Sequence, residues 1–379
     1  MLRKIFGLSL MLAGMCTCTF AQNAKATIVV NNPSGIARTE ELVAVDWKDI
    51  TAKYPGIDTA NFKVMDLTGK REVAWQLEHR GEKGIKNLLL QLSLKASASL
   101  KLAIVQGKPA TVGRKTFGRY VPERFDDFAW ENDKIAFRMY GKALEGRKDN
   151  AFGTDVWAKR NAKLILDEWY KSGDYHKDHG DGLDYYHVGF TLGAGDIAPF
   201  VKDSVYYPGN YRTWRILDQG PLRFTFELSY AEWNVAGKSV KVVKTISLDA
   251  GSQMNRVEAV YTLTSGNSKL PVVIGIIKRK EAGEMLLDEK GGILGYWEPV
   301  HGEDGIIGTG TIALAPVDKM SVNEAQLFTH ATVPGNQAFV YYNGAAWNKA
   351  GQFTAARAWF DYLVRFKQKL EQPLKVGVQ

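Results

Sequence analysis

Cysteine is almost absent from the sequence, and this absence excludes several kinds of protein. Of the 379 residues only Cys16 and Cys18 are cysteines, and both lie near the N-terminus. If that segment is removed, the remaining chain can hold no disulfide, no thiolate nucleophile and no cysteine-ligated zinc. A chain of this length buries enough apolar surface to fold without covalent cross-links.

Long apolar runs and long basic runs are also missing. After the N-terminal segment, no stretch reaches the ~18 uninterrupted apolar residues of a membrane helix. The formal net charge is +8, but both signs are interspersed and the densest basic cluster is Lys278-Arg279-Lys280. We therefore expect no nucleic-acid partner. An acidic glycan fits a mildly basic protein better, although a solvated surface with excess lysine would give the same charge.

The N-terminal segment has the order of features found in secretory signal peptides. Arg3 and Lys4 precede an apolar run over residues 5–15, and a short segment of small residues ends at Ala21. This order predicts a cleaved signal peptide over residues 1–21, with Gln22 as the new terminus and a periplasmic or secreted location. The run is too short to anchor the protein across ~30 Å of hydrocarbon, so we expect no membrane association after cleavage.

Alternation of apolar and polar residues dominates the rest of the sequence. It runs through residues 222–230, 240–248 and 257–263, and through 88–94 and 100–104 nearer the N-terminus. Short alternating segments joined by Gly, Asn, Asp and Ser predict antiparallel strands with one buried face. One helix is expected over residues 354–370, where apolar side chains recur at helical spacing.

These patterns predict an all-β protein built in two parts. Residues 107–118 differ in composition from their surroundings and contain Gly and Pro, as is typical of a linker. We therefore expect a small N-terminal β-sandwich over residues 22–110. A large antiparallel β-domain with the active-site groove and one C-terminal helix would follow over residues 111–379.

The segment over residues 174–187 is the richest in groups that can transfer protons. It holds three of the six histidines, four aspartates and three tyrosines, and its two glycines indicate a loop. Histidine titrates near neutral pH, and tyrosine can protonate a leaving oxygen. The predicted catalytic residues are His176, His187, Tyr185 and Tyr186, and Asp184 is predicted to bind substrate.

Two other interpretations of this loop stay open. His176, His179 and an aspartate would form a metal site, or the histidines would serve only as hydrogen-bonding partners in a structural loop. The spacing of His176 and His179 lacks the helical register of the best-known zinc motif, and the aspartates do not match a calcium loop. We therefore predict no metal or cofactor. The alternative is a divalent cation bound near His176 and His179.

Aromatic and basic residues gather in turn-like stretches on either side of the loop. Flat aromatic rings can cover the apolar face of a sugar, and arginine can pair with a carboxylate through two hydrogen bonds. Aromatic residues of a β-protein also fill its core, which is the alternative for each of them. The predicted substrate-binding residues are Trp157, Lys159, Arg160, Arg212, Trp214, Trp297, Glu298, His301 and Trp347.

Four stretches resemble the signature of domain-of-unknown-function family 4861, namely residues 121–141, 157–160, 174–195 and 341–351. The resemblance covers nearly the whole mature chain. It implies export by polysaccharide-degrading bacteria and a fold similar to the galactose-mutarotase-like β-supersandwich. The small N-terminal sandwich resembles the one that precedes rhamnogalacturonan exo-lyase-like domains. The resemblance implies no particular activity.

The residues predict a glycan-processing enzyme that acts on a uronate-containing oligosaccharide by β-elimination. Histidine and tyrosine would supply acid and base, while Arg212 and Lys159 would neutralise the substrate carboxylate. A glycoside hydrolase with paired carboxylates, drawn from Asp181, Asp184 and Glu298, is one alternative. A non-catalytic glycan-binding protein is the other. In each case the expected partner is an acidic oligosaccharide.

Overall fold

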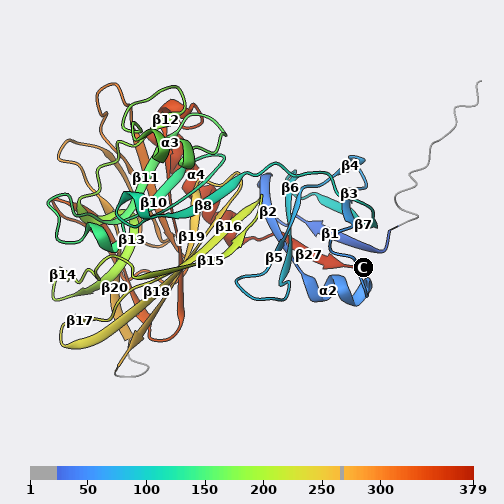
Figure 1. Cartoon of the computed structure of the whole chain (residues 1–379), viewed down its shortest axis with the longest axis horizontal. Coiled ribbons are helices and arrows are strands. Elements are labelled where there is room, and N and C mark those ends of the chain that lie inside the picture. Colours follow the sequence, from blue (N-terminus) through green and yellow to red (C-terminus); the bar gives the residue numbers. More distant parts are fainter. Residues whose placement is uncertain (1–23, 265–268) are drawn as a thin grey trace, which may run out of the picture.

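The protein consists of a large and a small β-sandwich that lie next to each other along its long axis (Figure 1). The computed structural model describes residues 24–264 and 269–379. The predicted signal peptide, with Cys16 and Cys18, lies outside these residues. Most of the described chain is in antiparallel strands, so the predicted all-β class is confirmed.

The small sandwich contains two sheets that enclose one apolar core. Its core is made of alternate side chains such as Ile28, Val30, Leu88, Leu90 and Ile104, all fully buried. The five-stranded sheet has the order β27 (Lys375–Val378), β1 (Ala26–Asn31), β7 (Ser99–Gln106), β3 (Phe62–Asp66) and β4 (Arg71–Glu72). The three-stranded sheet has the order β2 (Arg38–Asp46), β6 (Asn87–Leu94) and β5 (Trp75–Glu78).

The large sandwich packs a ten-stranded sheet against a nine-stranded sheet. The ten-stranded sheet has the order β24 (Lys319–Val322), β25 (Gln326–Pro334), β20 (Lys269–Ile277), β13 (Phe190–Val201), β11 (Phe152–Lys159), β10 (Ala136–Met139), β9 (Asp127–Asn132) and β8 (Thr116–Val121), with β12 (Gly182–Leu183) on β11 and β14 (Ser204–Val205) on β13. The nine-stranded sheet has the order β15 (Thr213–Gln219), β16 (Arg223–Ser229), β18 (Lys238–Asp249), β19 (Met254–Leu263), β26 (Ala338–Trp347), β23 (Ile307–Ala313), β22 (Ile293–Trp297) and β21 (Glu284–Asp288), with β17 (Trp233–Val235) on β18.

The alternating pattern of the sequence corresponds to real strands. The three segments predicted around residues 222–263 are β16, β18 and β19, which are neighbours in the nine-stranded sheet. Their inward side chains, among them Phe226, Val242 and Val257, belong to the main core between the two large sheets. Burial of one face of each strand explains why the apolar residues recur at every second position.

The end of the chain departs from the predicted division into two parts. Strand β27 pairs with β1, so the last residues return to the small sandwich instead of staying in the large one. In Figure 1 this red strand lies among the blue strands of the small sandwich. Residues 107–115 form the other connection between the two parts and have no regular secondary structure.

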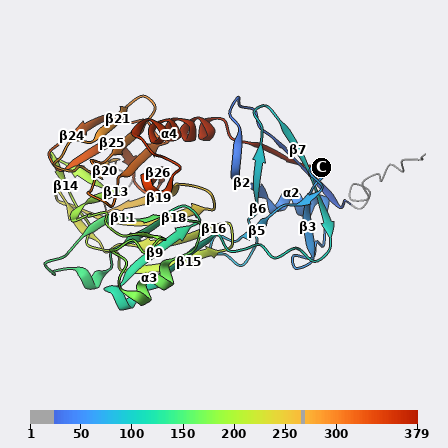
Figure 2. The ribbon, with the colours of Figure 1, turned by 90° about the horizontal axis from the view of Figure 1, so that it is seen from above.

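Three α-helices and three short 3-10 turns complete the described chain. Helix α4 (Ala356–Glu371) corresponds to the predicted C-terminal helix and extends toward the small sandwich (Figure 2). It packs closely on β22 and β23 because these strands present glycines: a Cβ added at Gly310 would lie 2.6 Å from the Leu363 side chain. None of the described helices is long and apolar enough to cross a membrane. The remaining elements are α2 (Trp47–Lys53), α3 (Leu166–Ser172), η1 (Pro122–Arg124), η2 (Lys142–Leu144) and η3 (Asn348–Ala350).

Candidate active site

A pocket of about 320 Å³ brings together three segments that are far apart in the sequence. We call it the Glu298 pocket. One segment follows β12, the second follows β20, and the third is the loop between β22 and β23. The lining residues are Tyr185, His187, Arg279, Glu281, Glu298, Pro299, Val300, His301 and Gly302.

The loop between β22 and β23 is held in one conformation by local hydrogen bonds. The backbone N–H of His301 donates to the Gly305 carbonyl at 2.8 Å, and that of Asp304 donates to the His301 carbonyl at 2.9 Å. Gly305 has φ +95°, and a Cβ there would lie 2.4 Å from the Asn348 side-chain oxygen. The indole N–H of Trp347 donates to the Asp304 carbonyl at 2.8 Å. These contacts fix His301 at the edge of the pocket.

An ion pair between half-buried Arg279 and buried Glu298 forms the wall of the pocket. Arg279 Nε donates to Glu298 Oε1 at 2.7 Å, and Arg279 Nη1 donates to the His187 carbonyl at 2.6 Å, so this arginine ties the three segments together. Burial raises the pKa of Glu298 to about 7, although the positive charge of Arg279 opposes the shift. Glu298 is therefore able to exchange a proton near neutral pH.

Tyr185 and His301 stack in the pocket with their ring centroids 5.3 Å apart. Asp304 lies 3.0 Å from His301 Nδ1, so a proton on Nδ1 donates to this carboxylate and leaves the lone pair on Nε2. Burial and the negative charge of Glu298 raise the pKa of Tyr185 far above its ordinary value, so the phenol stays protonated. Its buried hydroxyl makes no hydrogen bond of normal geometry within the described residues, since the nearby Trp347 indole N–H donates to the Asp304 carbonyl instead. An imidazole oriented by Asp304 and a protonated phenol therefore share one pocket.

The residue before Tyr185 is anchored in a buried charge cluster. Arg138 contacts Asp155 at 2.6 Å, Asp184 at 3.0 Å and Asp127 at 3.6 Å, and all four side chains are buried. Burial raises the pKa of Asp127 to about 7, and burial together with the negative charge of Asp155 raises that of Asp184. Because Asp184 precedes the pocket residue Tyr185, this cluster fixes where the segment that lines the pocket leaves the core.

Four of the predicted site residues line the Glu298 pocket, namely Tyr185, His187, Glu298 and His301. A fifth, Tyr186, lies beneath it: its ring is buried, and the Arg279 guanidinium lies 4.8 Å from the ring centroid. His176 is not among the lining residues. Its Nδ1 is 2.8 Å from the Asp184 carbonyl and its side chain is 66% exposed, so it braces the loop from outside.

The expectation that four tryptophans line one groove is wrong. Trp157, Trp297 and Trp347 are buried in three different apolar clusters, with exposures of 0%, 4% and 2%. Trp157 stacks on Trp169 and Tyr175 and does not face solvent. Trp214 is exposed, but it stacks on Tyr120 away from the pocket lining. Tryptophan next to a charged residue therefore marks core here more often than a ligand surface.

Most of the charged residues that were predicted to bind a ligand instead form ion pairs within the protein. Lys159 is buried and pairs with Glu131 at 2.6 Å, and Asp184 pairs with Arg138, so neither faces a ligand. Arg212 contacts Glu145 at 2.9 Å. Arg160 pairs with Asp178 and lies 4.9 Å from the Trp347 ring. These ion pairs correct the assignment of Lys159 and Arg212 as the groups that neutralise a substrate carboxylate.

The loop over residues 174–187 does not bring together the ligands of the alternative metal site. His179 Nε2 lies 2.9 Å from Asp174, whereas His176 contacts the backbone of Asp184. In residues 24–264 and 269–379, no group of three or more His, Cys, Asp or Glu side chains is placed to hold a metal ion.

Three charged residues of the site were not predicted, namely Arg279, Glu281 and Asp304. Arg279 belongs to the densest basic cluster of the sequence, which was the signal available for it. Asp304 follows His301 by three residues in a glycine-bearing stretch, a spacing that brings both onto one tight loop.

Comparisons with known proteins agree with the predicted family. The family described as "Domain of unknown function (DUF4861)" matches residues 30–376. "Uncharacterized protein P7" of Formosa agariphila is 30% identical over 390 residues, covering 96% of each chain. A protein in the Glycosyl Hydrolase Family 38 from Enterococcus faecalis superposes with a TM-score of 0.53 at 9% identity, over 95% of this chain and 49% of the other. An α-mannosidase from Enterococcus faecalis V583 gives a TM-score of 0.49 at 9% identity, over 93% of this chain and 46% of the other. The chain thus spans about half the length of these solved structures, and the likeness to the family 38 protein concerns the fold alone.

Proposed function

The chain belongs to the DUF4861 family, and we propose that it is a glycan-processing enzyme that cleaves a uronate-containing oligosaccharide by β-elimination in the Glu298 pocket. One observation carries the proposal. A phenol without a partner, an oriented imidazole, a carboxyl group with a pKa of about 7 and an arginine meet in one pocket. Folding does not require these groups to converge, whereas acid–base chemistry on a carboxylate substrate does.

Arg279 and Glu298 are suited to hold the substrate carboxylate. The guanidinium supplies positive charge, and Glu298 in its protonated form donates a hydrogen bond to a carboxylate oxygen. Both interactions strengthen as negative charge moves onto that carboxylate during removal of the neighbouring proton. The exposed Lys280 and half-buried Lys278, which flank Arg279, add positive charge near the entrance.

His301 and Tyr185 are suited to act as base and acid. His301 Nε2 takes the proton from the carbon next to the carboxylate, and the electron pair left there forms a carbon–carbon double bond. The bond from the adjacent carbon to the glycosidic oxygen breaks, and the Tyr185 hydroxyl protonates that oxygen as it leaves. The protonated imidazole and the phenolate then exchange a proton, through water, to restore both groups.

A glycoside hydrolase is the second candidate, because two carboxylates line the pocket. Glu281 is exposed and Glu298 is buried, which is the contrast in environment that separates a base from an acid in such enzymes. The shared fold with a family 38 protein does not decide between the two reactions, since one fold supports many functions.

A panel of acidic polysaccharides separates these reactions. With pectin, alginate and glycosaminoglycan fragments as substrates, we expect a rise in the ultraviolet absorbance of a conjugated enoate for at least one of them. Since protonated Glu298 is the active form, the rate should fall as the pH rises through about 7.

The control is a panel of neutral glycans of matched length, which should give no signal. New reducing ends without the enoate band would indicate hydrolysis instead. No product from any acidic glycan, with protein that is folded by circular dichroism, would leave the lyase proposal without support.

A further inference from the structure

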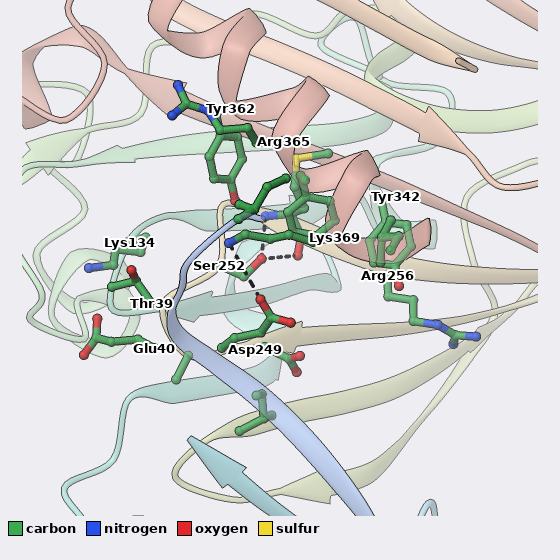
Figure 3. Close-up of a pocket in the computed structure, with 18 of the residues that line it drawn as sticks. Thr39, Glu40, Lys134, Asp249, Ser252, Arg256, Tyr342, Tyr362, Arg365 and Lys369 are labelled. Carbon is green, nitrogen blue, oxygen red and sulfur yellow. Dashed lines mark hydrogen bonds and ion pairs between the residues drawn. The ribbon is translucent and has the colours of Figure 1, made fainter. Parts of the chain in front are cut away.

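A second and larger cavity, of about 830 Å³, lies between helix α4, the nine-stranded sheet and strand β2 of the small sandwich (Figure 3). We call it the α4 groove. Tyr362, Arg365 and Lys369 project from the helix at one side, while Thr39 and Glu40 lie on the strand at the other. None of its lining residues belongs to the Glu298 pocket.

The groove runs along α4 from Ala358 onward, and its cations Arg365 and Lys369 lie at the end of the helix that is farther from the Glu298 pocket. The start of α4 packs next to the strands that lead into the Glu298 pocket. The Trp359 indole donates to the Thr309 carbonyl, and Gly308 lies in close contact with both Trp359 and Trp297, the residue before Glu298. Arg365 and Lys369 lie in the last two turns. Ten residues of helix correspond to about 15 Å, so one small ligand cannot occupy both places.

Five cationic and three acidic side chains line the groove, so positive charge exceeds negative charge there. Glu41 is the one carboxylate that Arg38 and Lys369 share there, at 2.9 and 3.7 Å. Arg365 adds a third cation, and its Nε donates a hydrogen bond to the backbone carbonyl of Asp361 at 3.2 Å. Burial, together with the positive charges of Arg38 and Arg365, lowers the pKa of Lys369 although Glu41 opposes the shift. This excess of positive charge would attract an anion to the end of the helix.

Aromatic side chains adjoin these cations. Tyr342 and Tyr362 are half-buried and line the groove together with Phe366, whose ring meets that of Tyr342 edge-on at 5.3 Å. The Tyr362 hydroxyl accepts a hydrogen bond from the Gln253 backbone, so its ring is held in place. Fixed aromatic rings next to arginine and lysine are the combination that recognises a sugar ring bearing an acid group.

We propose that the α4 groove is a second, non-catalytic binding site for an anionic glycan, with Arg365 and Lys369 contacting its acid groups and Tyr342 and Tyr362 its sugar faces. The choice of a glycan as ligand rests on the proposed function, whereas the anion site rests on the charges of the groove itself. A polysaccharide held here would keep the enzyme on its substrate between reactions at the distant pocket.

The test is binding of a uronate hexasaccharide, measured by calorimetry on the full protein in the Tyr185→Phe background, which removes turnover. The double variant Arg365→Gln/Lys369→Gln should bind about tenfold or more weakly at this site, because two charge-assisted hydrogen bonds are lost. The matched control is Arg357→Gln on the same helix, which removes a cation that is 86% exposed and pairs with Asp361. The Arg357→Gln variant should bind the uronate hexasaccharide as tightly as the Tyr185→Phe protein does.

The outcomes separate this inference from the proposed function. The proposal is supported if the double variant loses uronate binding, Arg357→Gln keeps it, and a neutral hexasaccharide binds to none of these proteins. Unchanged uronate binding in the double variant overturns it, and so does equal binding of the neutral sugar. Turnover of small substrates by the double variant in an otherwise native protein should be normal, so a failure of the lyase assay would concern only the Glu298 pocket.

Discussion

Replacement of Tyr185 by phenylalanine is expected to lower kcat by roughly 10²-fold or more, which is the usual contribution of a general acid. The phenylalanine keeps the ring that stacks on His301 but lacks the hydroxyl that would protonate the leaving oxygen. The thermal midpoint should be unchanged or slightly higher, because the hydroxyl is buried without a hydrogen-bond partner in the described part of the chain. Steady-state kinetics and a melting curve on the same preparation measure both effects.

Tyr341→Phe is the matched control for this substitution. Tyr341 also has a buried hydroxyl for which residues 24–264 and 269–379 provide no partner, but it lies in the main core and does not line the pocket. Its variant should keep full activity. If Tyr185→Phe retained normal turnover as well, Tyr185 would not be the acid.

Replacement of Arg138 by methionine is expected to destabilise the protein by about 3–5 kcal/mol, because it leaves buried carboxylates without their cation. Asp127, Asp155 and Asp184 all contact this one guanidinium. The carboxyl groups would then hold their protons more tightly in the folded than in the unfolded state. Stability of the variant should therefore fall as the pH rises above the ordinary carboxyl range, and the deficit should be larger at about pH 8 than at about pH 5.

Urea unfolding of both proteins at the two pH values measures this deficit. Arg147→Met is the control, since it removes an exposed ion pair with Asp149 and should change stability by no more than about 0.5 kcal/mol. An equal and small effect of both substitutions would show that the Arg138 cluster does not hold the segment before Tyr185.

The strands were predictable from the sequence, but their partners were not. Alternation in β16, β18 and β19 reports one buried face, and the structure buries those side chains. The same pattern says nothing about pairing: β6 and β7 are joined by a short turn yet lie in different sheets. Strand β27 pairs with β1 from the opposite end of the chain, and no local signal announces such a contact.

The candidate site was predictable only where composition was unusual. The density of His and Tyr over residues 174–187 indicated Tyr185 and His187, which line the pocket, but also His176, which does not. Lys159 was predicted to meet a ligand because a sequence does not show that Glu131 neutralises it in the core. Arg279 was missed for the same reason, since its role follows from a contact with Glu298, which is 19 residues away.

The most direct test of the account is the crystal structure of Tyr185→Phe with a uronate oligosaccharide that the native protein cleaves. We expect a uronate ring in the Glu298 pocket, with its carboxylate on Arg279 and Glu298 and the carbon next to that carboxylate about 3–3.5 Å from His301 Nε2. Oligosaccharide bound only elsewhere on the protein, or a ring in the pocket with its carboxylate turned to solvent, would contradict the proposed reaction.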